Sequence, residues 1–148
     1  MSYTSLTYHL VFSTRYRIGV IDQGHEKELY KFMFDFASRK GIKIRRIGGM
    51  PDHVHILCDI PANIAVSDFV RLLKSESSKF MKINENFPLW DGWTKRYAAF
   101  SVDASLREVR RQYIMHQREH HSRVSFADEM RQIFIEVGLD PDTLEFAE

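Results

Sequence analysis

The chain has 148 residues, with 21 Lys and Arg against 20 Asp and Glu, so its formal net charge is +1. This length suits one domain with a substantial core, and no apolar run approaches the roughly 20 residues that a bilayer span requires. The sequence has no signal-peptide pattern and one cysteine, Cys58. It therefore excludes a disulfide framework and predicts a protein of the reducing cytoplasm.

The small net charge hides an asymmetry along the chain. From Asp128 onward seven acidic residues face a single basic residue, Arg131, which gives this segment −6 and leaves +7 on the preceding 127 residues. A basic body of this kind suits a phosphate backbone. We expect a single domain over residues 1–148, with an acidic C-terminal helix and tail of low order from about residue 125. The tail could buttress a dimer or shield the basic face.

Four predicted elements occupy the first third of the chain. Residues 3–14 are rich in β-branched and aromatic side chains and predict a strand. Residues 22–40 carry apolar side chains at helical spacing, which predicts an amphipathic helix closed by a glycine. Residues 42–47 alternate apolar and basic side chains and predict a second strand. Residues 48–52 then predict a turn into a third strand that begins at His53.

The rest of the chain predicts three helices and one further strand. After a proline break, a helix is expected from Ser67 or Asp68 through Phe80, followed by irregular chain over residues 84–95. Residues 97–102 predict the fourth strand. Residues 103–121 contain no Gly or Pro and begin with a natural N-cap, Asp103, so they predict one helix. Residues 125–137 predict a last amphipathic helix.

The order of these elements is β-α-β-β-α-β followed by helices. This order is that of the split βαβ, or ferredoxin-like, arrangement, an α+β fold with a four-stranded antiparallel sheet. We expect helices on one face of the sheet, with the C-terminal helices added to this unit. The other face would then be free to bind single-stranded nucleic acid, although the fold alone does not decide function.

Two histidines flank a valine in the third predicted strand. Side chains alternate along a strand, so His53 and His55 point to one face while Val54 points to the other, and Cys58 is expected to face the core opposite the histidines. Two neighbouring imidazoles are suitable metal ligands. The alternative is a pair of surface histidines on a half-exposed strand.

A tyrosine and a glutamine lie four residues apart in the helix predicted over residues 103–121. On one helix Tyr113 and Gln117 would share a face. A phenol oxygen can attack phosphorus, and an amide oxygen can complete a His-His-amide metal site. The alternatives are a half-buried core position for Tyr113 and a solvated helix position for Gln117.

Together these residues resemble the HUH single-strand DNA transposases with one catalytic tyrosine. Members of this family mobilise small bacterial insertion sequences, and relatives are associated with repetitive palindromes. The resemblance extends over nearly the whole chain. It rests on residues 8–17, 49–57, 73–79 and 97–101 and on Tyr113 with Gln117.

The resemblance implies a metal-dependent transposase that cleaves and rejoins single-stranded DNA at element ends through a 5′-phosphotyrosine. Its catalytic residues would be Tyr113, His53, His55 and Gln117, and the last three would hold Mg²⁺ or Mn²⁺. Because these three ligands are neutral, the cation would keep its full charge for the phosphate. The substrate would be single-stranded DNA with hairpin ends. The protein would be a homodimer, with possible exchange of the tyrosine helix.

Several residues have weaker predicted roles. Asp52 could orient a histidine ring or be an ordinary turn residue, and His120 could supplement the site or be a polar helix end. Basic side chains are predicted to contact phosphates, with a solvated surface as the alternative. These are Arg15, Arg17, Lys43, Arg45, Arg46, Lys74 and Lys79.

Two other functions remain open from the sequence. One is a domesticated protein that binds hairpin DNA or RNA without cutting it. The other is a metal-dependent hydrolase of small phosphates. The absence of predicted carboxylate ligands and the basic body count against the hydrolase.

Overall fold

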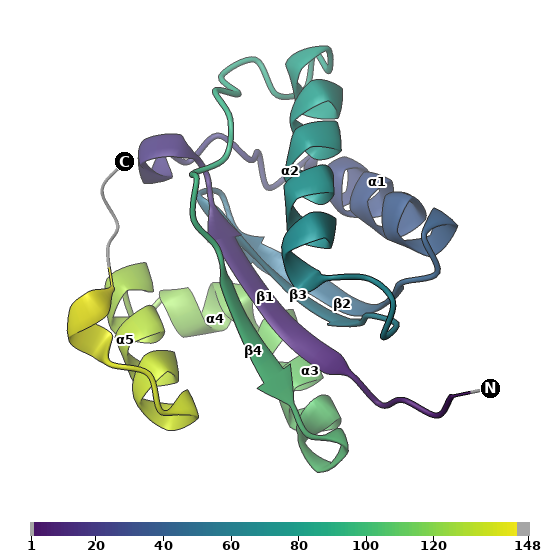
Figure 1. Cartoon of the computed structure of the whole chain (residues 1–148). Helices are drawn as coiled ribbons and strands as arrows, with labels where there is room; N and C mark the ends of the chain where they lie inside the picture. Colours follow the sequence, from purple (N-terminus) through teal and green to yellow (C-terminus); the bar gives the residue numbers. More distant parts are fainter. Residues whose placement is uncertain (1, 145–148) are drawn as a thin grey trace.

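The computed structural model describes residues 2–144 and places all four strands in one antiparallel sheet (Figure 1). The strands are β1 (Thr7–Ser13), β2 (Lys43–Met50), β3 (His53–Asp59) and β4 (Ala98–Val102). Their order is β2-β3-β1-β4, so β1 and β3 are central. The predicted ferredoxin-like arrangement is confirmed.

Helices α1 (Glu26–Arg39) and α2 (Val66–Lys82) cover one face of the sheet (Figure 1). The main core lies between them and β3, which presents Val54, Ile56 and Cys58 to this side. The predicted inward position of Cys58 is therefore confirmed, and its thiol is free and buried. Alternation along β3 then sends His53 and His55 to the opposite face.

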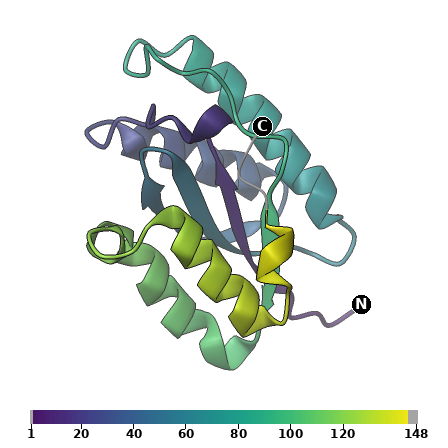
Figure 2. The same ribbon diagram turned by 90° about the vertical axis from the view of Figure 1, so that its left-hand side faces the viewer.

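The opposite face is covered as well, which corrects the expectation of a free face. Helices α3 (Arg107–Met115), α4 (Gln117–His121) and α5 (Phe126–Val137) form a second layer beneath the sheet (Figure 2). The physical reason is that this face also carries apolar side chains. Leu57 packs with Ile114 of α3 in one small cluster, and a second cluster joins the sheet to α5. Leaving these side chains in water would cost about 1.5–3 kcal/mol each.

The helix predicted over residues 103–121 is divided into three pieces. Asp103 caps a short 3-10 helix, η2 (Ala104–Leu106), by accepting a hydrogen bond from the Ser105 amide. Helix α3 follows, and His116, with φ −103° and ψ 28°, separates it from α4. The His116 ring donates to the Gln112 carbonyl over 2.8 Å, and the His116 amide donates to the same carbonyl over 3.1 Å. The prediction of one unbroken helix is wrong.

Strand β2 is longer than predicted, and the turn after it is shorter. The turn predicted over residues 48–52 is limited to Pro51 and Asp52, because both glycines pair with β3. A register shift between Ile44 and Arg46 marks a β-bulge at Arg45. This extra residue explains how Ile44 and Ile47, three positions apart, can both be directed toward the core.

Two further 3-10 helices occur, η1 (Arg15–Arg17) after β1 and η3 (Pro141–Thr143) after α5. The second is held to α5 by Arg131, which donates to the Pro141 carbonyl and pairs with Asp142. The predicted tail also includes Glu145 and Glu148, which lie outside the described residues. Among residues 2–144, no helix is both long enough and apolar enough to cross a bilayer.

Candidate active site

His53 and His55 form the centre of a buried polar cluster between the sheet and its second helical layer. Both point to the predicted common face, and their ring centroids are 5.2 Å apart. They are only 1% and 0% exposed, so the alternative of surface histidines is wrong. Buried polar side chains of this kind need partners, and the cluster supplies them from four other elements.

Asp52 fixes the orientation and tautomer of the His53 ring. The Nδ1–H of His53 donates to Asp52 Oδ1 over 2.7 Å. In the neutral ring this leaves Nε2 as an acceptor, and Nε2 lies 3.2 Å from Gln117 Oε1, which is also an acceptor. Two acceptors at this distance need a proton or a cation between them. Asp52 therefore lies where it can orient the His53 ring, as one of its two predicted roles requires.

His55 is held between β1 and α5. Its Nδ1 lies 2.8 Å from Nε2 of His9 on β1, and its Nε2 lies 3.3 Å from Glu129 Oε1. Complete burial lowers the pKa of His55 to about 4, despite the opposing effect of Glu129, so the ring is neutral near pH 7. His9 was not predicted as a site residue, because the β1–β3 register brings the two imidazoles together and the sequence does not reveal that register.

Glu129 of α5 is the main residue that the sequence analysis missed. Its side chain is 1% exposed, and its Oε2 accepts hydrogen bonds from Tyr113 and from the Gln117 amide, the latter over 2.9 Å. Burial opposes ionisation, but hydrogen bonds from His121 and His55 hold the pKa of Glu129 well below its usual value. A carboxylate therefore adjoins the three neutral side chains that were predicted to hold the cation. One sequence signal was available, since an acidic residue occupies the otherwise apolar stripe of residues 126, 129, 130 and 133.

Tyr113 reaches the histidine cluster of its own chain. Its hydroxyl donates to Glu129 Oε2, and its ring centroid lies 5.8 Å from that of His55. Burial and the Glu129 carboxylate raise the pKa of Tyr113 above its ordinary value. Although the helix breaks between Tyr113 and Gln117, both side chains converge on the same carboxylate.

His121, which was not predicted as a site residue, also joins the cluster. Its Nε2 lies 2.9 Å from Glu129 Oε1, and its ring centroid is 4.7 Å from that of His53. Burial acts in the opposite direction, but the bond to Glu129 raises the pKa of His121. His120 lies farther away, with Nε2 3.5 Å from Glu129 Oε2.

The seven basic residues predicted to contact phosphate have different partners and surroundings. Arg17 is nearest the cluster and lines a small pocket with Asp52, His53 and His121. Lys74 donates to two backbone carbonyls, those of Thr94 and Arg96. Three more of these residues form ion pairs: Arg45 with Asp59, Arg15 with Asp91 and Lys79 with Glu76. The nucleic-acid roles of all seven residues, including Lys43 and Arg46, stay predictions.

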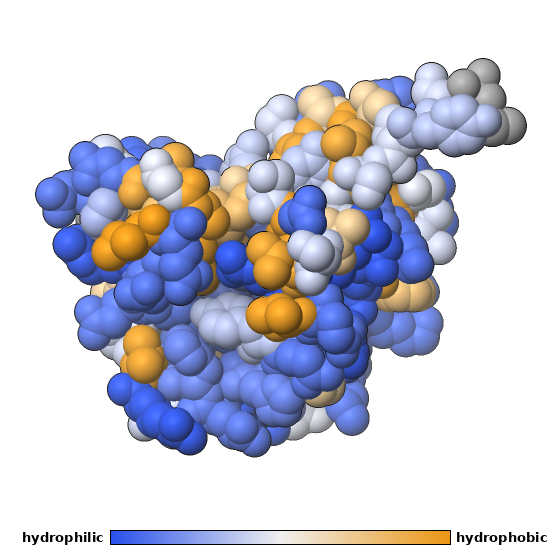
Figure 3. All heavy atoms as spheres, turned by 90° about the horizontal axis from the view of Figure 1, so that it is seen from below, coloured by the Kyte–Doolittle hydropathy of each residue, from blue (hydrophilic) through white to orange (hydrophobic). Residues whose placement is uncertain are grey.

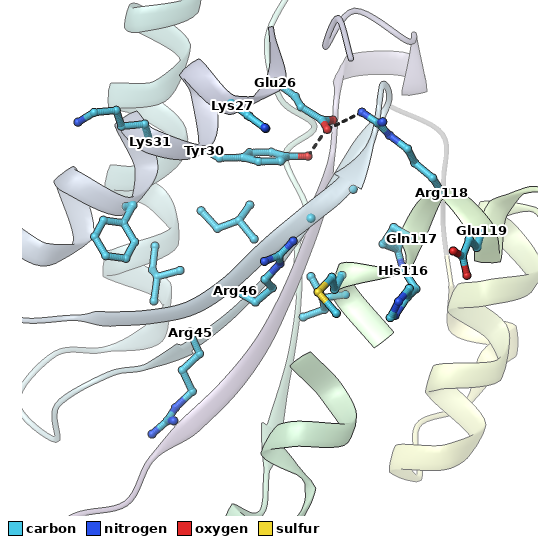
Figure 4. Close-up of a pocket in the computed structure, with 17 residues that line it drawn as sticks. Glu26, Lys27, Tyr30, Lys31, Arg45, Arg46, His116, Gln117, Arg118 and Glu119 are labelled. Carbon is cyan, nitrogen blue, oxygen red and sulfur yellow. Dashed lines mark hydrogen bonds and ion pairs between the residues drawn. The ribbon is translucent and has the colours of Figure 1, made fainter. Parts of the chain in front are cut away.

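A basic groove of about 620 Å³ runs between α1, β2 and α4 and reaches Gln117 (Figure 4). An ion pair of 2.7 Å between Glu26 and Arg118 crosses it. Four of its cationic side chains are Lys27, Lys31, Arg46 and Arg118. The groove therefore places positive charge beside Gln117, which belongs to the cluster.

A second groove, of about 560 Å³, lies between α3 and α5 and reaches Tyr113 and Glu129. Leu106, Val109 and Ile133 supply its apolar lining. Seen from below, the surface on this side is hollowed, and both hydrophobic (orange) and hydrophilic (blue) residues border the hollow (Figure 3). The nucleophile candidate is thus approached from a different side than Gln117.

The profile of the family described as "Transposase IS200 like" matches residues 2–117. The chain belongs to this family. The ISDra2 transposase TnpA of Deinococcus radiodurans is 31% identical over 121 residues, which are 77% of this chain and 85% of the relative. The IS200 transposase of Salmonella typhimurium is 27% identical over 122 residues, 76% of each chain. The chain is accordingly a transposase, a DNA-processing enzyme of mobile elements.

Two solved structures share the fold. A crystal structure of a Deinococcus radiodurans transposase superimposes with a TM-score of 0.59 at 28% identity and covers 79% of this chain and 95% of its own. A REP-associated tyrosine transposase bound to a REP hairpin gives a TM-score of 0.63 at 16% identity, covering 84% and 76%. The second likeness concerns the fold alone. The absence of a carboxylate no longer argues against the small-phosphate hydrolase, because Glu129 lies beside the histidines. Family membership argues against the hydrolase instead.

We expect replacement of Asp52 by Ala to weaken cation binding by roughly 10–100-fold, because His53 loses the partner that orients its ring. Isothermal titration with Mn²⁺ measures this. Asp35→Ala is the control, since Asp35 pairs only at the surface with Lys31. Equal affinities for the two variants would contradict an orienting role.

We expect the free energy of unfolding, measured in EDTA, to fall as the pH drops from about 6.5 toward 4. Burial lowers the pKa of His9 and of His55, the latter to about 4, so in this range the unfolded chain binds protons that the folded chain does not. Each such proton contributes a slope of about 1.4 kcal/mol per pH unit. His121, whose pKa is raised, acts in the opposite sense and stabilises the fold below pH 6.5.

Urea unfolding at several pH values measures this slope. In His55→Gln the slope should decrease by about one proton's contribution. An unchanged slope in that variant would show that His55 is not the group responsible.

Proposed function

We propose that this transposase cuts and rejoins single-stranded DNA through a covalent 5′-phosphotyrosine at Tyr113, with Mg²⁺ or Mn²⁺ held by His53, His55 and Gln117. The observation that supports this most is the convergence of the Tyr113 hydroxyl and the two imidazoles on one buried cluster within a single chain. No nucleotide cofactor is required, because the covalent bond conserves the energy of the broken phosphodiester.

The residues of the cluster fit a divalent cation. The donor set contains two imidazole nitrogens and an amide oxygen, and the acceptors His53 Nε2 and Gln117 Oε1 face each other over 3.2 Å. A bound cation would polarise the scissile phosphate and neutralise charge that develops on its oxygens. Asp52 and His9 orient the two rings from behind.

The cleavage step can be written from the side chains. The Tyr113 oxygen loses its proton and bonds to the phosphorus, the bond from phosphorus to the 3′ oxygen breaks, and the 3′ oxygen takes up a proton from solvent and leaves as a hydroxyl, so that no net proton is consumed. Glu129 Oε2 accepts the Tyr113 hydrogen bond and is the acceptor within reach of the phenol proton. Attack of a 3′-hydroxyl on the phosphotyrosine reverses the step and rejoins the strand.

We further propose hairpin-bearing single-stranded DNA as the substrate. The basic groove supports contact with a phosphate backbone, because Lys27, Arg46 and Arg118 line it on the way to Gln117. The hairpin is supported by the related REP-associated transposase, whose structure holds a REP hairpin. A homodimer remains part of the proposal, and light scattering in solution tests it. Exchange of the tyrosine helix is not needed to build the site, since Tyr113 contacts Glu129 of its own chain.

Covalent capture tests the proposal. Wild-type protein incubated with a labelled single strand from an element end and Mn²⁺ should yield an adduct that survives denaturation, and Tyr113→Phe should yield none. Tyr3→Phe is the control, because this tyrosine is 91% exposed whereas the histidines of the cluster are buried. Equal adduct from Tyr113→Phe would refute the proposal. Tight, metal-independent hairpin binding with no adduct from wild type would favour the non-cleaving alternative.

A further inference from the structure

We propose that Glu129 and His121 are additional ligands of the cation that His53 and His55 hold. This inference rests on the proposed function and extends its metal site. Both residues lie beyond residue 117, where the family match ends. The C-terminal segment of this chain would therefore complete a site that the family motifs build only in part.

The geometry of one carboxylate oxygen carries the proposal. Glu129 Oε1 lies 3.3 Å from His55 Nε2, 3.6 Å from His53 Nε2 and 2.9 Å from His121 Nε2. One ligand atom from each of these four residues lies within 4.8 Å of all the others. Ligand atoms about 2.1 Å from a common ion are roughly 3.0–3.4 Å apart in octahedral or tetrahedral geometry. The three distances from Glu129 Oε1 to the imidazole nitrogens, 2.9–3.6 Å, are close to this range.

Hydrogen bonds alone leave part of this cluster unsatisfied. The two oxygens of Glu129 divide their contacts, with Oε2 facing Tyr113 and Gln117 and Oε1 facing the histidines. Neutral His53 donates its ring proton in a hydrogen bond to Asp52, so its Nε2 is an acceptor. This Nε2 faces two other acceptors, Gln117 Oε1 and Glu129 Oε1. A cation among these atoms converts three mutually repulsive acceptors into ligands.

Helix α5 is built to hold Glu129 in this position. The Ser125 hydroxyl caps its first turn by accepting from the Asp128 amide, and Met130 and Ile133 anchor the helix in an apolar cluster against the sheet. The carboxylate is therefore delivered on a packed element rather than on a loose loop. Three imidazoles and one carboxylate also favour transition ions such as Mn²⁺ over Mg²⁺.

Metal binding to the intact protein tests the proposal without reference to catalysis. We expect Glu129→Gln and His121→Asn each to bind Mn²⁺ roughly 10–100-fold more weakly by titration calorimetry. Both should also change the visible absorption of bound Co²⁺. Glu136→Gln is the matched control, because Glu136 is an exposed glutamate on the same helix that contacts Gln132. Its Mn²⁺ affinity and Co²⁺ spectrum should match those of wild type.

Circular dichroism reports whether each variant folds. If Glu129→Gln does not fold, the Mn²⁺ affinity of His121→Asn tests the proposal. Wild-type affinity and an unchanged Co²⁺ spectrum in the folded variants would overturn the inference. If His53→Ala abolishes binding while these variants keep it, the inference fails and the proposed function stands. Adduct formation by Tyr113→Phe would instead refute the proposed function, whatever the metal affinities are.

Discussion

Replacing His53 and His55 together by alanine should abolish tight cation binding and adduct formation. Both rings are buried in the cluster, and each offers an Nε2 toward its centre. We expect Mn²⁺ affinity to fall by at least about 100-fold, which corresponds to about 2.8 kcal/mol of binding free energy. Titration calorimetry measures the affinity, and denaturing gels measure the adduct.

His25→Ala is the control for this double variant. The His25 ring is partly exposed, pairs with Asp22 before α1 and packs against Phe87, and neither partner belongs to the cluster. Its Mn²⁺ affinity and adduct yield should equal those of wild type. Retention of tight binding in a folded His53→Ala, His55→Ala protein would place the cation elsewhere and contradict the site described above.

Gly48→Ala should destabilise the protein and displace α3. A Cβ at this position of β2 would lie 2.3 Å from the Ile114 carbonyl oxygen, a backbone atom that cannot rotate away. Overpacking of this kind costs typically about 1–3 kcal/mol. Because Ile114 follows Tyr113, movement of α3 would also draw the phenol out of the cluster. Urea unfolding measures the lost stability, and adduct formation reports the position of the phenol.

Gly24→Ala provides the comparison. There the nearest atom to a new Cβ is a carboxylate oxygen of Asp22 at 3.6 Å, an ordinary contact. This variant should keep wild-type stability and adduct yield. If Gly48→Ala were as stable and as active as Gly24→Ala, the close approach of α3 to β2 would not be what positions Tyr113.

The sequence predicted the features that depend on local periodicity. The period of two along β3 correctly separates His53 and His55 from Cys58, and the element order correctly gives the antiparallel sheet. Gln117, which the family resemblance associates with His53, lies 3.2 Å from it, although the helix that carries Tyr113 and Gln117 is not the regular one expected. These inferences succeed because alternation along a strand survives small errors in element boundaries.

The features that depend on distant packing were not predicted. The histidine face of the sheet also carries the apolar side chain of Leu57, and Ile114 of α3 covers it. Glu129 was counted with an acidic tail, yet α5 folds back and buries it against His55 and His121. His9 reaches His55 only through the β1–β3 register. Each of these contacts joins segments whose relative position no short motif encodes.

A crystal structure of the Mn²⁺-soaked protein, with anomalous diffraction at the manganese edge, tests the central claim most directly. The account predicts one strong anomalous peak within about 2.3 Å of Nε2 of both His53 and His55, with the Tyr113 ring of the same chain beside it. A peak remote from these rings, or a Tyr113 of the same chain directed away from them, would contradict it.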